Sequence, residues 1–144
     1  MRLFVGNSLI NDNLKKVMSN EELIRKFYQA FKIKDMQTIN QVCDESIEWN
    51  TLKGMPCGGK YVGLKATFDD YFPNMLSNFE EFHAIPEEFI ESKDHVAVIG
   101  RYIGISKNGK KFDVPFSHVY LIQENKIKQF RQFTDTKVIQ DSLN

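Results

Sequence analysis

The stretch FDVPFSHVYLIQENKIKQFRQFTD, residues 112–135, decides how the rest of this sequence is interpreted. Two runs rich in aromatic and β-branched residues flank a short polar turn, which is the pattern of an antiparallel hairpin. One run carries His118 between apolar neighbours, and the other leads to Arg131 and Asp135. Groups that handle protons or charge thus arrive on adjacent strands of a largely apolar sheet, where we expect the chemistry of this protein.

The alternation of apolar and polar residues continues on both sides of this turn and before the hairpin. It predicts a meander of four strands, at residues 79–91, 95–105, 110–123 and 126–133. Asn108-Gly109, between the second and third strands, favours a tight hairpin turn. The tail at residues 136–143 is expected to form a short helix.

The N-terminal half shows helical spacing instead. Ser19 to Glu22 forms a capping box that predicts a helix start, and Asp35 caps a second, shorter helix. A short strand is expected at residues 46–49 and a third helix after Gly63, which Pro73 should end or kink. Helices first and a meander afterwards predict an α+β fold, with N-terminal helices packed on one face of a curved antiparallel sheet.

Composition and charge argue against several classes of protein. Lysine plus arginine (19) equals aspartate plus glutamate (19), and no basic block stands out, so no nucleic-acid partner is expected. No apolar run approaches the roughly 20 residues of a membrane span. Cys43 and Cys57 lie outside any metal-binding spacing, so we expect reduced thiols and a cytoplasmic location. We also expect no metal and no cofactor.

The length of 144 residues predicts one domain. Residues 1–17 are rich in asparagine and differ in character from the rest of the chain, and Met18 stands directly before the capping box. Two interpretations stay open, a translation start at Met18 or an N-terminal extension of an intact domain over residues 18–144.

Five segments, in their order and spacing, carry a resemblance to a known family: Phe27–Phe31, Ile47–Trp49, Gly59–Leu64, His118–Tyr120 and Asn125–Thr136. From Ser19 to about Leu143 the chain resembles the nuclear transport factor 2-like superfamily and, within it, the SnoaL-like, ketosteroid-isomerase-related proteins. The resemblance implies a cone-shaped, cystatin-like α+β barrel around a deep apolar pocket. It also implies a homodimer formed through the sheet.

Ketosteroid isomerases use a tyrosine of the first helix and an aspartate after the first strand. The position that resembles the tyrosine holds Phe27, with Tyr28 beside it, and the aspartate position falls near Asn50 or Thr51. Because neither Asn50 nor Thr51 takes a proton at neutral pH, steroid isomerisation is not expected.

Two other members of the superfamily suggest different roles. Limonene-type epoxide hydrolases use an arginine and two aspartates; Arg101 and Asp135 resemble two of them, and Ile103 stands where the second acid is needed. SnoaL-like polyketide cyclases use an aspartate near the end of the last strand, which Asp135 resembles, with His118 as a plausible companion.

Asp135 and His118 each have two interpretations. Asp135 is either an acid/base in an apolar pocket, where desolvation raises its pKa, or the N-cap of the last helix. His118 is either catalytic or a hydrogen-bonded, inert histidine on a sheet face. Strand alternation places Phe116, His118 and Tyr120 on one face, which is either the pocket or a dimer interface.

Arg101 shares a strand face with apolar residues, which indicates either a salt bridge, with Glu88 for example, or an anionic ligand. Other candidate ligand-binding residues are Phe27, Tyr28, Trp49, Met55, Phe72, Phe116 and Arg131.

Our leading hypothesis is a protein that binds a small apolar molecule bearing an oxygen. Its reaction would be proton transfer by a cofactor-free isomerase, cyclase or dehydratase, with Asp135 and His118 as the catalytic pair. The alternative is a non-catalytic ligand-binding or dimeric interaction module on the same fold.

Overall fold

The computed structural model describes residues 18–144, and the proposed N-terminal extension lies outside these residues. Helical segments occur at α2 (Asn20–Ile33), α3 (Met36–Val42), the π-helix η1 (Lys65–Tyr71), α4 (Phe72–Leu76) and α5 (Thr136–Leu143). The strands are β1 (Cys43–Asn50), β2 (Lys60–Val62), β3 (Phe79–Ser92), β4 (His95–Ser106), β5 (Lys111–Gln123) and β6 (Lys126–Thr134). The four predicted meander strands are confirmed to within a residue or so at each end.

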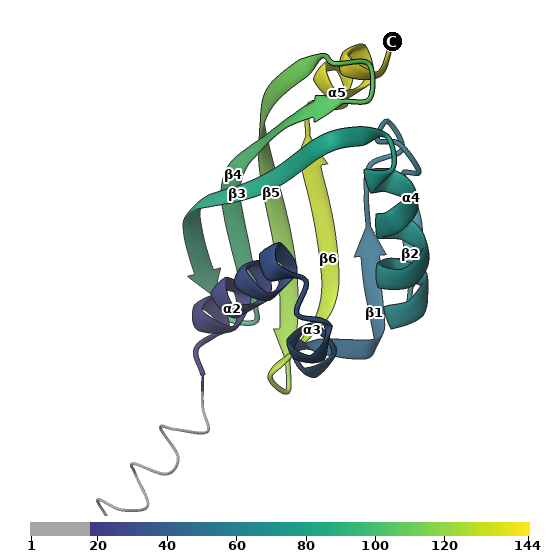
Figure 1. Cartoon of the computed structure of the whole chain (residues 1–144). Helices are drawn as coiled ribbons and strands as arrows, with labels where there is room; N and C mark the ends of the chain where they lie inside the picture. The colour runs from purple at the N-terminus through teal and green to yellow at the C-terminus, as the bar shows by residue number, and fades with distance from the viewer. Residues whose placement is uncertain (1–17) are drawn as a thin grey trace, which may run out of the picture.

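One curved sheet carries all six of these strands in the order β2-β1-β6-β5-β4-β3. The helices α2 and α3 and the segment of η1 and α4 lie against its concave side (Figure 1). The predicted α+β fold is confirmed, with two corrections. The sheet is open, and it is mixed because β1 runs parallel to β6, with Trp49 opposite Phe130.

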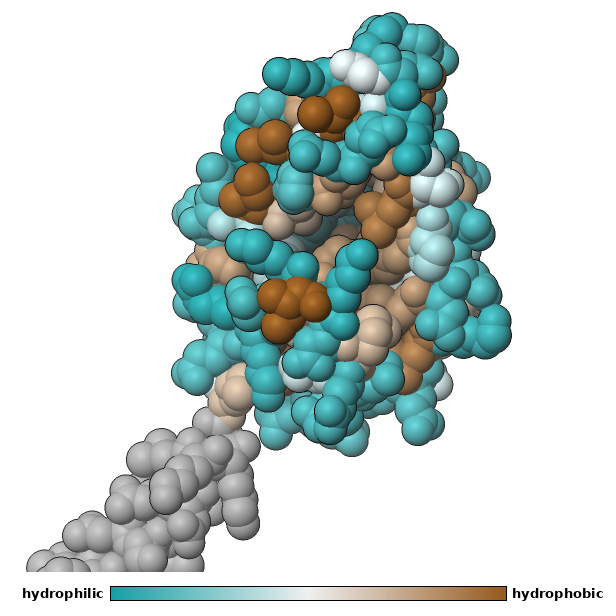
Figure 2. Space-filling model, viewed as in Figure 1, coloured by the Kyte–Doolittle hydropathy of each residue, from teal (hydrophilic) through white to brown (hydrophobic). Residues whose placement is uncertain are grey.

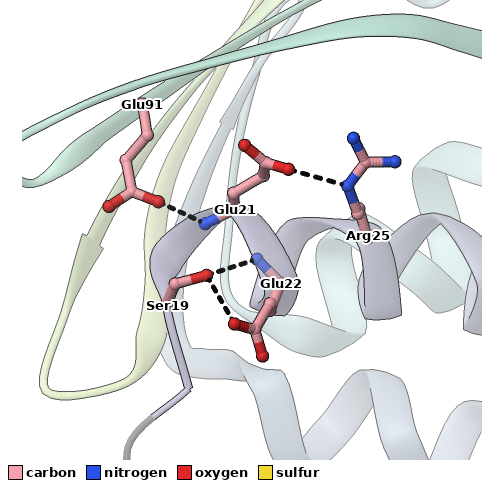
Figure 3. A network of polar contacts seen from close by, with 5 residues as sticks. All are labelled: Ser19, Glu21, Glu22, Arg25 and Glu91. Atoms are coloured by element: carbon pink, nitrogen blue, oxygen red, sulfur yellow. Dashed lines mark hydrogen bonds and ion pairs between the residues drawn. The ribbon is translucent and has the colours of Figure 1, made fainter.

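The start of α2 is fixed from two directions (Figure 3). The Ser19 hydroxyl accepts a hydrogen bond from the Glu22 amide at 3.0 Å, as the capping box predicted. The Glu21 amide donates to the Glu91 carboxylate at 2.7 Å, which joins the helix start to the end of β3. Lys34, in the left-handed conformation at φ 59°, ends the helix.

Aromatic rings cover much of the inner face of the sheet. Trp49 stacks on Phe130 with ring centroids 3.8 Å apart. On β4 a glycine makes room for a ring of β5, because a Cβ at Gly100 would lie 2.6 Å from the Phe116 ring and 2.2 Å from the Ile85 carbonyl oxygen. The inner face of the sheet is therefore shaped by rings that lie across neighbouring strands.

We expected Pro73 to end or kink the third helical segment, but the segment continues past this residue. The chain forms a π-helix up to Tyr71 and an α-helix from Phe72, and Pro73 occupies the first turn of that α-helix. A proline in the first turn of an α-helix costs that helix no hydrogen bond. At this point the chain therefore changes from a π-helix to an α-helix instead of ending its helical segment. This segment places Tyr71 and Phe72 against the interior.

Candidate functional site

A cavity of about 650 Å³ opens between α2, α4, β3 and the concave side of the sheet. Figure 2 shows the hollow, with predominantly hydrophobic residues inside it and a mainly hydrophilic surrounding surface that also carries a few hydrophobic residues. Aromatic side chains of α2, β1, α4 and β3 form much of the wall. This size and lining are typical of a site for a small organic molecule.

His118 lies on the inner face of β5 and is 4% exposed. Its ring stacks on Phe116 at a centroid distance of 3.9 Å and meets the edge of Phe130 at 4.8 Å. These contacts fix the plane of the imidazole, so that its two nitrogens point in opposite directions along the cavity wall.

Both nitrogens of His118 are hydrogen bonded to tyrosines. The Tyr28 hydroxyl lies 2.6 Å from Nδ1, and the Tyr102 hydroxyl lies 2.5 Å from Nε2. The Tyr120 hydroxyl donates to the Tyr28 hydroxyl at 2.9 Å. We call Tyr28, His118, Tyr102 and Tyr120, together with Gln132, the tyrosine–histidine array.

Gln132 completes this array on β6. Its side-chain nitrogen donates to the Tyr102 hydroxyl at 2.9 Å, while its side-chain oxygen accepts from the Leu52 amide at 3.2 Å. The Leu52 contact fixes the orientation of the amide, because the flipped form would place two donors against each other. Tyr102 therefore receives a hydrogen bond at its oxygen in either state of His118.

Burial keeps the array uncharged. It lowers the pKa of His118 to about 3, and it raises the pKa values of Tyr28, Tyr102 and Tyr120 well above their ordinary range. At neutral pH the imidazole is neutral and all three phenols keep their protons. The array thus offers hydrogen-bond donors to a ligand without presenting a charge.

The number of protons in the array determines which hydroxyl can donate to a ligand. A neutral imidazole has one N–H, so it donates to one of its two tyrosines and accepts from the other. With the proton on Nε2, Tyr28 donates to His118 and the hydroxyl proton of Tyr102 is free; with the proton on Nδ1, the roles are reversed. In each tautomer one hydroxyl proton is left to donate to a ligand oxygen.

Five of the residues predicted from the sequence line the cavity: Phe27, Tyr28, Trp49, Phe72 and His118. Phe116 and Met55 are buried at 3% and 2% exposure but lie outside the lining. Phe116 still acts on the site, because its ring supports that of His118.

Asp135 is placed differently from its predicted position in an apolar pocket. Its side chain is exposed, lies outside the cavity lining and accepts a hydrogen bond from the Lys137 amide at 3.1 Å. That is the capping geometry of the alternative interpretation. Because the exposed carboxylate does not line the cavity, we leave Asp135 out of the candidate site.

Arg101 and Arg131 also lie away from the cavity. Arg101 projects from the outer face of the sheet and pairs with Asp113 at 2.6 Å, so Glu88 is not its partner. Arg131 is exposed and is not among the lining residues. Because adjacent strand residues point to opposite faces, these arginines share a face on which the cavity does not open.

We expect Asp135→Ala to lower the free energy of unfolding by about 0.5–2 kcal/mol, through loss of the α5 cap. Ligand affinity at the cavity should stay unchanged. Urea unfolding and a binding titration on the same preparations check both halves, with Asp135→Asn as the control that retains capping. A large loss of binding with intact stability would return Asp135 to the site.

Tyr102 and Gln132 are members of the array that sequence reasoning missed. Tyr102 alternates with Gly100 and Gly104 on β4, and an aromatic residue between two inward-facing glycines was the available signal. Gln132 carried no signal, because its role depends on the pairing of β6 with β5, where it lies opposite His118.

Other chemistry finds little support in the described part of the chain. Within residues 18–144 no group of three or more histidine, cysteine or acidic side chains could hold a metal ion. Both cysteines are free, and burial raises the pKa of the Cys43 thiol to about 12, which suits a core residue. In this same range no helix is long and apolar enough to cross a membrane.

Comparison with known proteins identifies the family to which this chain belongs. The model of the SnoaL-like domain family matches residues 24–130, and the chain belongs to this family. Its fold is that of the nuclear transport factor 2-like superfamily. No curated protein matches the sequence significantly.

Solved structures agree on the fold. An NTF2-like protein of unknown function from Burkholderia pseudomallei is similar with a TM-score of 0.81 and 24% identity, covering 88% of this chain and 99% of that one. TerC, co-crystallised with polyporic acid, has a TM-score of 0.78 at 24% identity over 85% and 95% of the two chains. A protein from Catenulispora acidiphila with a ketosteroid isomerase-like fold, in complex with trimethylamine, has a TM-score of 0.72 at 13% identity over 86% and 93%.

Proposed function

We propose that this protein binds an apolar small molecule through a carbonyl or hydroxyl oxygen, which accepts a hydrogen bond from Tyr28 or Tyr102. The observation that carries the proposal is the neutral His118 held between these two tyrosines on the cavity wall. Two proteins of similar fold were crystallised with small molecules, polyporic acid and trimethylamine, which supports a ligand site in this scaffold.

The same array supports proton transfer without a cofactor, as in an isomerase, cyclase or dehydratase. Tyr102 gives its hydroxyl proton to a substrate oxygen and takes the proton of His118 Nε2. In the same concerted step, Nδ1 takes the hydroxyl proton of Tyr28, and Tyr28 takes a proton from a second substrate position. One proton enters and one leaves the substrate, no protein group becomes charged, and His118 ends as the other tautomer.

A test of binding uses a biphenyl methyl ketone, with ethylbiphenyl as the analogue that lacks the oxygen. We expect the ketone to bind more tightly, and Tyr102→Phe or Tyr28→Phe to weaken ketone binding by about tenfold, as for one neutral hydrogen bond. Tyr61→Phe is the matched control, because the Tyr61 hydroxyl donates to the Cys57 carbonyl away from the array. Equal affinity for the two compounds would refute the proposed oxygen contact.

The second candidate function, a non-catalytic binding module, is favoured by one observation. No aspartate or glutamate of the described chain lines the cavity, so the site has no strong base to start proton removal. Exchange of the ketone's methyl hydrogens in D₂O, followed by NMR, separates the two functions. Exchange accelerated by the wild type and lost in Tyr102→Phe supports catalysis, and tight binding without exchange supports the binding module.

We also propose that two copies pair through the outer face of the sheet. Ile99, Ile103 and Phe133 each expose between 37% and 46% of their surface on β4 and β6, which is unusual for one face of a globular domain. Sedimentation is expected to show a dimer at micromolar concentration, and Ile99→Lys should convert it to monomer. A wild type that sediments only as monomer would contradict the pairing.

A further inference from the structure

The mouth of the cavity carries charge of one sign. Arg25, Lys32 and Lys34 of the α2 segment are exposed side chains that contribute to the cavity lining, and no acidic side chain within residues 18–144 contributes to it. The three cations are exposed, whereas the tyrosine–histidine array is buried. The positive charge therefore lies at the mouth of the cavity, and the uncharged hydrogen-bond donors lie at its inner end.

The three cations are not equivalent. Arg25 is paired with Glu21 at 2.9 Å (Figure 3) and lies over the Phe89 ring at 4.0 Å, so its charge is already partly compensated. Lys32 and Lys34 take part in none of the ion pairs found within residues 18–144. Their ammonium groups remain available to an anion entering the cavity.

The backbone adds a second observation. Lys34 occupies the left-handed conformation that ends α2, at φ 59°, where glycine is the favoured residue because it has no Cβ. Basic side chains at the end of a helix also interact well with its dipole, and this explains a general preference for lysine there. That preference does not explain why two lysines border the opening of a cavity whose described lining contains no acidic residue.

We propose that the natural ligand is an aromatic or otherwise flat apolar molecule with a carboxylate at one end and a carbonyl or hydroxyl oxygen at the other. The carboxylate lies at the mouth near Lys32 and Lys34, the apolar part lies between the aromatic walls, and the oxygen meets Tyr28 or Tyr102. This inference rests on the proposed function and adds the substrate class and the direction in which the ligand enters.

The test uses a para-acetylbiphenyl carboxylic acid, whose ketone and carboxylate lie at opposite ends, together with its neutral methyl ester. With the full chain at pH 7.5 and low salt, we expect the acid to bind roughly 2- to 5-fold more tightly than the ester, as for an ion pair near the surface. Raising the ionic strength should reduce this preference, because exposed charges are screened.

Substitutions of the lysines at the mouth of the cavity test whether these residues cause the preference for the acid. The double variant of Lys32→Gln and Lys34→Gln should remove the preference for the acid, so that the acid and the ester bind with equal affinity. Lys26→Gln is the control, because Lys26 is exposed on the same helix but does not line the cavity. Urea unfolding of each variant excludes a loss of fold as the cause.

The outcomes separate this inference from the function on which it rests. Acid and ester that bind equally, with both weakened by Tyr102→Phe, would overturn the carboxylate site and leave the oxygen contact intact. A preference for the acid that persists in the double lysine variant would also overturn it. If neither compound binds, both the carboxylate site and the proposed function fail for this class of ligand.

Discussion

Replacing His118 with phenylalanine is expected to destabilise the protein by about 2–4 kcal/mol, because two buried hydroxyls lose the partner that they share. The phenyl ring retains the stacking on Phe116 but offers no partner to the hydroxyls of Tyr28 and Tyr102. A buried polar group left without its partner costs about 1–3 kcal/mol. The remaining contacts to Tyr120 and Gln132 limit the loss, because each hydroxyl keeps one hydrogen bond.

A thermodynamic cycle identifies the cause of that loss. If unpaired hydroxyls are responsible, adding Tyr28→Phe and Tyr102→Phe to His118→Phe should recover part of the stability, since removing both partners of a hydrogen bond costs less than removing one. His95→Phe, an exposed histidine on β4, is the control for a general effect of the substitution. A loss below about 0.5 kcal/mol for His118→Phe, within the range of a surface change, would show that the array adds little to stability.

Acidification should weaken the fold before most carboxylates titrate. Burial depresses the pKa of His118 to about 3 in the folded state, from an ordinary value near 6.5. Between these values the unfolded chain binds a proton that the folded chain does not bind, so the free energy of unfolding falls as the pH falls through this window. Linkage gives a loss of about 2 kcal/mol between pH 7 and pH 5.

Urea unfolding at half-unit steps from pH 7 to pH 5 measures this slope. His118→Phe lacks the titrating ring, so its stability should be nearly flat over the same range. The carboxylates of Asp35, Asp44 and Glu48 have pKa values lowered by their hydrogen bonds to Thr38, Lys128 and Lys60, and they act mainly below pH 5. If the free energy of unfolding of the wild type did not change between pH 7 and pH 5, water or a proton would reach the His118 ring in the folded protein.

Local patterns in the sequence account for most of the fold. The capping box at Ser19, the cap at Asp35 and the alternation after Phe79 each act over a few residues, so they could be read from the chain directly. The parallel pairing of β1 with β6 could not be read in this way. It joins Trp49 to Phe130, and alternation defines the faces of a strand but not the identity or direction of its neighbour.

The candidate site was only partly predictable for the same reason. His118 was noticed because an ionisable residue interrupts an apolar run. Its partners Tyr28, Tyr102 and Gln132 come from three different elements, and only the tertiary structure brings them together. Asp135 satisfied two local patterns at once, and the structure realises the capping pattern because the strand ends there and leaves the side chain in water.

The position of β6 between β1 and β5 bears on how the protein is made. Of the six strands described, β6 leaves the ribosome after the others, and it joins the β1–β2 pair to the β3–β5 meander. Until it emerges, β1 has no partner on that side, and its contact with β6 spans about half the chain, a separation that slows folding. The cavity wall formed by Phe130 and Gln132 is therefore absent from every nascent chain that ends before β6, so the complete cavity forms only after synthesis of the C-terminal hairpin.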